Sequence, residues 1–137
     1  MRHKILVAIV ALSCWTQATY ANIAVIVHPS NQQAITDTDV KNLFTGRQKS
    51  FADGSPAIVL NLNSGDATQS AFNNKALGRS DAQLKAFWSK VMFTGKGNPP
   101  KEVDSAEMLK LIAENPSIIG VIDASQATSA VRIAITY

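Results

Sequence analysis

The feature that most constrains this chain is an apolar run of strand length that passes through a glycine turn directly into a helical pattern. Residues 57–62 form the run, the polar turn Asn-Ser-Gly-Asp follows at residues 63–66, and helical spacing begins at residue 67. In open α/β sheets, ligands lie where strands hand over to helices at their carboxyl ends. The first N–H groups of such a helix have no partner inside it, and together with the helix dipole they suit an anion. The segment therefore indicates an anion site, or a turn in which Ser64 or Asp66 simply caps the helix.

The rest of the chain continues this alternation of strands and helices. The apolar, β-branched run 23–27 predicts a strand that is buried on both faces. Further strands are predicted at 118–122 and 131–137, and further helices at 37–44, at 67–77, from Ser80 to Thr94 and from Asp104 to Asn115. The order β-α-β-α-α-α-β-β predicts a single α/β domain with a mixed, mostly parallel sheet that is flanked by helices.

Apolar residues recur at three- and four-residue steps in the helix that follows Ser80, at Leu84, Phe87, Trp88, Val91 and Met92. This spacing predicts that one face of the helix packs in the core. Phe93 is assigned to the core with them, because large aromatic side chains are usually buried. The glycines and prolines of residues 95–100 end the helix.

The first 21 residues have the pattern of a secretory leader. Basic residues at Arg2 and Lys4 precede an apolar run at 5–11, and small residues before Asn22 suit a signal peptidase. We therefore expect residues 1–21 to be removed and residues 22–137 to form one exported domain. The alternative is a lipoprotein modified at Cys14.

Charge and residue content argue against several functions. The formal net charge of +3 falls to +1 without Arg2 and Lys4, and no basic patch argues for nucleic acid. Cys14 is the only cysteine, and His28 is the only histidine beyond the leader. These two residues cannot build a usual zinc site, and His28 is typical of a turn. We expect no metal, no cofactor and no catalytic site.

Several motifs resemble the periplasmic phosphate-binding proteins of ABC importers. They are 26–31 (Ile-Val-His-Pro-Ser-Asn), 43–46 (Leu-Phe-Thr-Gly), 51–54 (Phe-Ala-Asp-Gly), 87–100, and 115–122 (Asn-Pro-Ser-Ile-Ile-Gly-Val-Ile). The resemblance covers nearly all of residues 22–137. Full members have two lobes that close on the ligand and are more than twice as long, so the chain is similar to a short branch with one lobe of this type II periplasmic-binding-protein fold. The resemblance implies a periplasmic, non-enzymatic domain that binds phosphate or a similar oxyanion for phosphate uptake.

The resemblance also places the ligand at the turn after residues 57–62. The family's turn carries an arginine ahead of a Ser-Gly-Thr run that opens a helix. Thr68 matches the threonine here, whereas Leu62 stands at the arginine and Asp66 at the serine. Without the arginine a bidentate, charge-assisted contact is missing. The residues predicted to bind the ligand are Ser64, Gly65, Asp66, Thr68 and Gln69 in the turn, with Ser30 and Asn31 at the end of the first strand.

Two functions remain open from the sequence. A single lobe gives a half-open site, so phosphate would bind weakly unless a second copy or another protein supplies the other wall. The alternative is a ligand-free interaction or sensory module that partners a membrane transporter, a sensor or an outer-membrane protein. Leu62 and Asp66 at the former anion turn favour this alternative.

Overall fold

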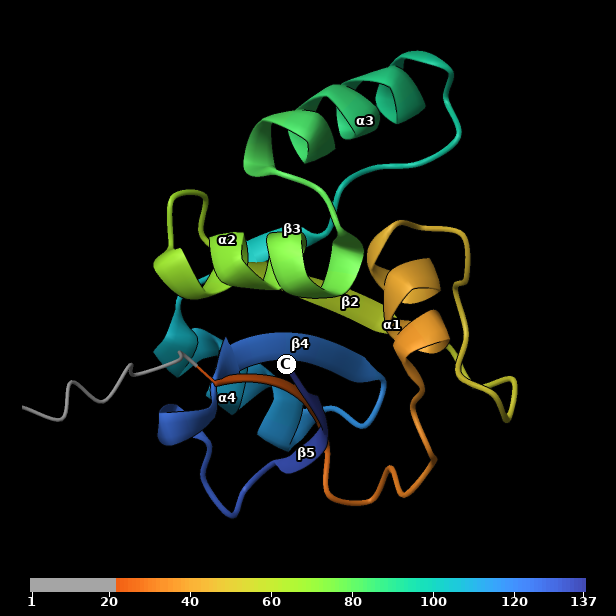
Figure 1. Cartoon of the computed structure of the whole chain (residues 1–137). Coiled ribbons are helices and arrows are strands. Elements are labelled where there is room, and N and C mark those ends of the chain that lie inside the picture. Colours follow the sequence, from red (N-terminus) through yellow and green to blue (C-terminus); the bar gives the residue numbers. More distant parts are fainter. Residues whose placement is uncertain (1–21) are drawn as a thin grey trace, which may run out of the picture.

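The fold is a five-stranded sheet with helices on both faces. The computed structural model describes residues 22–137, so the predicted leader and Cys14 lie outside the described residues. The elements in chain order are β1 (Ile23–Val27), α1 (Asp37–Phe44), β2 (Ile58–Leu62), α2 (Ala67–Phe72), the π-helical turn η1 (Asn73–Leu77), α3 (Asp81–Phe93), β3 (Lys101–Val103), α4 (Ser105–Glu114), β4 (Ile118–Asp123), the 3-10 turn η2 (Ala124–Gln126) and β5 (Arg132–Thr136). Figure 1 shows how these elements surround the sheet. The predicted α/β class is confirmed.

The strands are ordered β3-β2-β4-β1-β5 across the sheet. β2 runs parallel to β3 and β4, whereas β1 runs antiparallel to both β4 and β5. The sheet is therefore mixed, as predicted: four of its five strands run in one direction, and two of its four strand pairs are parallel. Because β1 opposes the other strands, its carboxyl end lies at the amino end of β2.

β1 is the centre of the core because it is buried on both faces, as its composition predicted. All five of its residues are fully buried. Successive side chains of a strand point to opposite faces. Val25 accordingly lies in the cluster that contains Phe44 of α1 and Phe72 of α2, whereas Ile26 lies in a second cluster with Met108 and Ile112 of α4. Helices α1 and α2 thus cover one face of the sheet and α4 covers the other.

Gly120 sets how closely α4 approaches β4. A Cβ atom at this position would lie 2.3 Å from Sδ of Met108 and 3.1 Å from Cδ1 of Ile112. Both side chains are fully buried. A glycine inside a strand indicates either a weakened strand or the close approach of another backbone. Here the close approach is made by side chains of α4, which fill the space that a Cβ would take.

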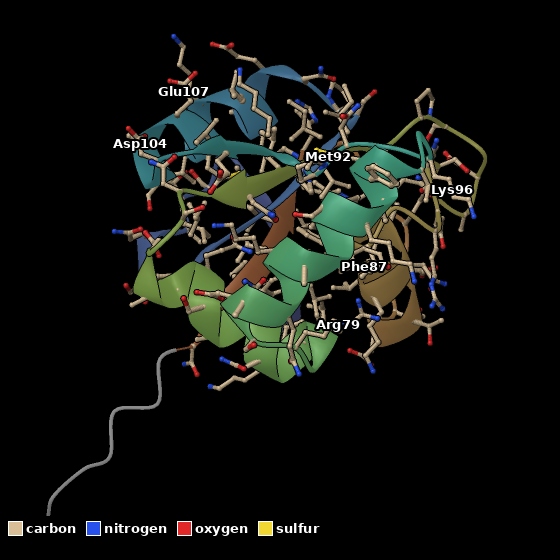
Figure 2. All side chains as sticks on the ribbon, turned by 90° about the horizontal axis from the view of Figure 1, so that it is seen from above. Arg79, Phe87, Met92, Lys96, Asp104 and Glu107 are labelled. Carbon is tan, nitrogen blue, oxygen red and sulfur yellow. The ribbon has the colours of Figure 1, made fainter. Side chains whose placement is uncertain are left out.

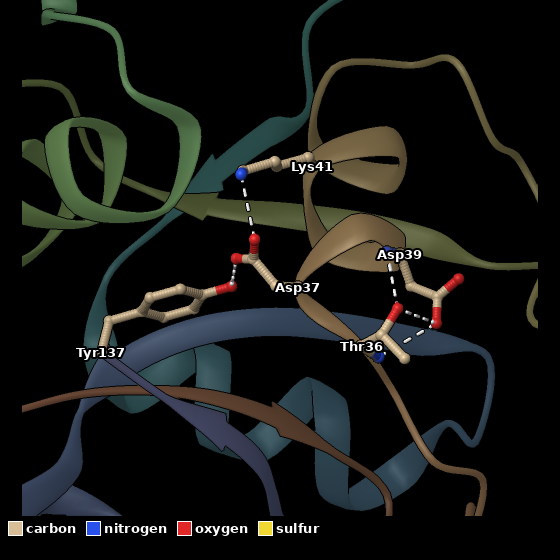
Figure 3. A network of polar contacts seen from close by, with 5 residues as sticks. All are labelled: Thr36, Asp37, Asp39, Lys41 and Tyr137. Atoms are coloured by element: carbon tan, nitrogen blue, oxygen red, sulfur yellow. Dashed lines mark hydrogen bonds and ion pairs between the residues drawn. The ribbon is translucent and has the colours of Figure 1, made fainter.

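Tyr137, directly after β5, is hydrogen-bonded to α1 through a polar network (Figure 3). The Tyr137 hydroxyl donates to Oδ1 of Asp37 at 2.7 Å, and Lys41 forms an ion pair with Oδ2 of Asp37 at 2.9 Å. The contacts from Lys41 and then from Tyr137 hold the pKa of Asp37 below its usual range. Burial, followed by the Asp37 contact, raises the pKa of Tyr137. A capping box between Thr36 and Asp39 lies beside this network at the start of α1.

α3 is the exception to core packing, and the prediction that its apolar face lies in the core is wrong. Leu84 is the only buried residue of α3, and no α3 residue belongs to either core cluster. Phe93 is 93% exposed and Met92 is 46% exposed. The chain leaves the sheet after Gly78 and turns back at Gly95, both with positive φ angles, and Figure 1 shows α3 set off from the sheet. The half-buried side chains of α3 are Phe87, Trp88 and Val91.

Candidate functional site

A cleft of about 500 Å³ lies between α3 on one side and, on the other, the carboxyl end of β2 and residues 99–102, which lead into β3. α3 supplies an apolar wall with Leu84, Trp88 and Met92, and the opposite side includes Leu62 of β2 and Phe44 of α1. Several of the regularly spaced apolar residues of α3 therefore line this cleft rather than the core. The predicted ligand turn opens onto the same cleft, since Ser64, Gly65 and Gln69 contribute to its lining.

The turn between β2 and α2 is closed by its own groups. The Asp66 N–H donates to the Asn63 carbonyl at 3.0 Å, and Gly65 has a φ of +86° at the third position, where a type II turn needs a positive φ. The Asp66 side chain then caps α2, because its Oδ1 accepts from the N–H groups of Thr68 at 2.8 Å and Gln69 at 3.4 Å. Donors that a bound anion would need are thus occupied by a carboxylate of the chain itself.

The charges around the turn also oppose an anion. The Ser64 hydroxyl donates to a carboxylate oxygen of Glu102 on β3. Lys85 is the one basic residue in the lining of the cleft, whereas Asp81 and Glu102 are acidic. Leu62, at the position where the family has arginine, is 1% exposed and belongs to the core. Within residues 22–137, no three histidine or acidic side chains lie close enough together to hold a metal ion.

Gln69 is a structural bridge in this structure. Its side chain is 6% exposed, accepts from the Leu62 N–H at 2.8 Å and donates to Oδ1 of Asn73 at 3.0 Å. Asn73 in turn donates to Oδ1 of Asp81 at 2.9 Å, and the Ser70 hydroxyl donates to the other carboxylate oxygen. The contacts of Ser70 and then Asn73 lower the pKa of Asp81 from its usual value. This network joins β2, α2, η1 and the first residue of α3, so it holds α3 at its amino end.

Asn61 contributes a polar group that sequence reasoning missed. It lines the cleft, and its side-chain oxygen is buried with no hydrogen-bond partner among the described residues. Buried acceptors without partners are rare because leaving one unpaired costs free energy. The alternation of β2 could have drawn attention to Asn61, because it is the polar residue in an otherwise apolar strand.

The structure does not bring Ser30 and Asn31 to the turn. β1 runs against β2, so its carboxyl end and the turn lie at opposite ends of the strands. Both residues line a separate, polar hollow that also includes Asp53 and Ser55. Asn31 is 7% exposed, its backbone carbonyl accepts from Arg132 at 2.6 Å, and its side-chain nitrogen has no partner among the described residues. The predicted site residues are thus divided between two places.

Several solved structures that share this fold are named as phosphate receptors or phosphate-binding proteins. An ABC-type phosphate transport receptor from Vibrio cholerae has a TM-score of 0.64 at 16% identity, over 82% of this chain and 46% of that chain. A structure with bound phosphate from Clostridium perfringens, named as a phosphate ABC transporter substrate-binding protein, has a TM-score of 0.64 at 22% identity, over 82% of this chain and 44% of that chain. PstS from Borrelia burgdorferi has a TM-score of 0.53 at 15% identity, over 74% and 41%.

The chain has the fold of one lobe of a phosphate-binding protein. It spans less than half the length of these structures, so the likeness covers the lobe alone. Comparison of the sequence with protein-family models and with curated proteins finds no match. The neighbouring structures are named as receptors or binding proteins. Among residues 22–137, no helix has the length and apolar character needed to cross a membrane.

Proposed function

We propose that this chain is a single-lobe interaction domain that has kept the phosphate-binding-protein fold and uses the cleft beneath α3 to hold a partner protein. The observation that carries this proposal is that the cleft combines an apolar wall with hydrogen-bond acceptors. Asn61 offers an unpartnered oxygen, and Asp81 and Glu102 offer carboxylates. An apolar segment that carries an amide, a hydroxyl or a basic group would satisfy these acceptors and cover Trp88 and Met92.

The same geometry argues against a free phosphate as the ligand of the predicted turn. The N–H groups of Thr68 and Gln69 already donate to Asp66. A phosphate would have to displace this carboxylate and then lie close to it, without an arginine to offset the repulsion. The proposal therefore assigns Asp66 a capping role and removes Gln69 from the ligand groups.

A weak oxyanion site is the second candidate function. It is favoured by the fold, since a structure of the same fold is described with bound phosphate, and by Lys85 in the lining of the cleft. In this version Ser64, Gly65 and Thr68 would hold the anion, and a second copy or another protein would supply the other wall. The domain would then serve phosphate uptake.

The predicted leader and the fold of the neighbours both support a periplasmic location for either function. The partner that fits the first proposal is a membrane transporter or a sensor with an exposed apolar segment. Nothing in the described residues argues for catalysis, so we do not propose an enzyme.

Phosphate titration of residues 22–137, followed by amide chemical shifts, separates the two functions. We expect no saturable shift at residues 63–69 at millimolar phosphate. Asp66→Ser keeps a capping hydroxyl but removes the charge, so this variant should shift more strongly with phosphate than the parent protein. Asp104→Ser is the matched control, because Asp104 caps α4 in the same way and is outside the lining of the cleft.

The partner is tested separately with a photo-crosslinking residue at Ser89, which is exposed and lines the cleft. In cells, the proposal predicts a discrete crosslink to one membrane protein, and no such crosslink from Ser125 on the 3-10 turn. Saturable phosphate binding by the parent protein, with no crosslink from Ser89, would replace the interaction domain by the oxyanion site.

A further inference from the structure

The charges of this chain are segregated along the sequence in a way that the net charge hides. Residues 79–101, which contain α3 and its flanking loops, carry five basic residues and one acidic residue, a formal charge of +4. Residues 102–123, which contain α4 and β4, carry one basic and five acidic residues, a formal charge of −4. Figure 1 places α3 at one end of the molecule and α4 toward the other.

Residues 79–101 also carry the most exposed large apolar side chain among residues 22–137. Phe93, the last residue of α3, is 93% exposed, whereas Ile58 and Ile133 are 46% and 42% exposed. Phe93 does not line the cleft beneath α3. The lysines nearest to it in sequence, Lys90 and Lys96, are both exposed.

The outer side of α3 is therefore different from the side that lines the cleft. Arg79 stacks over the Phe87 ring at 4.7 Å near the amino end, and Lys96 follows the carboxyl end. Figure 2 looks onto α3 with Arg79 and Lys96 at the two ends of the helix, and with Asp104 and Glu107 away from both at the margin of the molecule. A surface that contacts the outer side of α3 would thus contact basic groups and Phe93, whereas Asp104 and Glu107 lie away from that contact.

We propose that this outer side of α3 docks on a membrane surface that contains anionic phospholipid. Lys90 and Lys96 would contact the headgroups, and Phe93 would insert between them into the interface. Lys90 and Lys96, which are exposed and do not line the cleft, are complementary in charge to such a surface. A single exposed aromatic residue, with lysines three residues before and three residues after it in the sequence, suits a soft surface that can admit one side chain. A protein partner would need a preformed pocket at that point and a broader apolar patch.

This docking is independent of the proposed function, because it uses Phe93, Lys90 and Lys96, none of which lines the cleft. It would bring the cleft close to proteins embedded in the same membrane. The two proposals can therefore fail separately.

Sedimentation of residues 22–137, the folded unit described above, with phosphatidylglycerol-containing vesicles tests the docking. The protein should sediment with these vesicles at low ionic strength, should be released as salt rises, and should not sediment with phosphatidylcholine vesicles. Phe93→Ser should weaken binding about tenfold or more. Lys90→Gln and Lys96→Gln should each weaken it about fivefold.

The matched controls remove the same groups elsewhere. Ile133→Ser replaces another exposed apolar residue, and Lys49→Gln with Lys110→Gln removes two exposed lysines outside residues 79–101. These variants should bind as the parent protein does. Absence of binding to phosphatidylglycerol, equal binding to both kinds of vesicle, or equal losses in the control variants would each overturn the proposal. In those cases a protein partner would be the better occupant of this surface.

Discussion

α3 and α4 are two capped helices with apolar residues at helical spacing, but only α4 is buried on the sheet. Each begins with a side-chain cap, Ser80 for α3 and Asp104 for α4, and each repeats apolar residues at helical spacing. α4 buries Met108 and Ile112 completely on the sheet, whereas α3 buries Leu84 alone. The difference is the surface that the chain brings to each helix. Gly120 of β4 makes room for α4, and α3 meets an open cleft.

Helical spacing therefore indicates which side of a helix is apolar, but not whether another part of the protein covers that side. A helix whose apolar side is uncovered is available for binding, and α3 has two such surfaces. Its inner side faces the cleft, and its outer side ends in Phe93 and exposed lysines. Both proposals rest on this availability.

The same substitution in each helix should give the largest difference between them. Met108→Ala removes a fully buried side chain and should cost about 3 kcal/mol of unfolding free energy. Met92→Ala, at a residue that is 46% exposed, should cost less than about 1 kcal/mol. Urea unfolding of both variants measures the two values. Equal losses would mean that α3 is as much a part of the core as α4.

Gly120→Ala tests whether α4 packs so closely on β4 that only a glycine fits. The new Cβ would lie 2.3 Å from Sδ of Met108, so we expect a loss of about 2 kcal/mol. In a Met108→Ala background the crowding is relieved, and the same change should cost less than about 1 kcal/mol. A double-mutant cycle with no coupling between the two positions would show that crowding by Met108 is not the cause.

The anchor of α3 should respond to acid before the sheet does. Hydrogen bonds from Ser70 and Asn73 lower the pKa of Asp81 from 3.8, so its carboxylate holds α3 fully above about pH 4 and releases it as the pH falls below that value. Asp81→Ala should loosen α3 at every pH, with a smaller effect on unfolding of the sheet than Met108→Ala. The fluorescence of Trp88 reports both changes. If the Trp88 fluorescence is the same in Asp81→Ala as in the parent protein, and does not change in acid, Asp81 does not anchor α3.

The sequence predicts most of the sheet and its helices because their signals are local. The apolar, β-branched run 23–27 predicts a doubly buried strand, and the structure has it. The helices predicted at 37–44 and after Ser80 begin where expected, because Thr36 with Asp39 and Ser80 with Gln83 form capping boxes. The burial of α3 could not be predicted, because it depends on what faces the helix across the cleft. The type of sheet was predicted as mixed, but no local pattern indicated that β1 is the strand that runs backwards.

The candidate site was less predictable for the same reason. Because β1 runs against β2, Ser30 and Asn31 lie far from the turn that follows β2. The sequence does not reveal this separation, because each of the two strands is an apolar run followed by a polar turn. The capping role of Asp66 was one of two readings of the turn, and only the distances to Thr68 and Gln69 decide between them. The bridge from Gln69 through Asn73 to Asp81 joins three elements, so no single motif could reveal it.

Native-state hydrogen exchange of residues 22–137 tests the central contrast most directly, because it compares α3 and α4 in one experiment. The account predicts that amides of α4 exchange only through global unfolding, whereas amides from Lys85 to Phe93 exchange through local opening at least about tenfold faster. It also predicts that Asp81→Ala accelerates exchange in α3 alone. Equal protection of the two helices would contradict the account, because α3 would then belong to the cooperative core and its exposed side chains would not mark a binding surface.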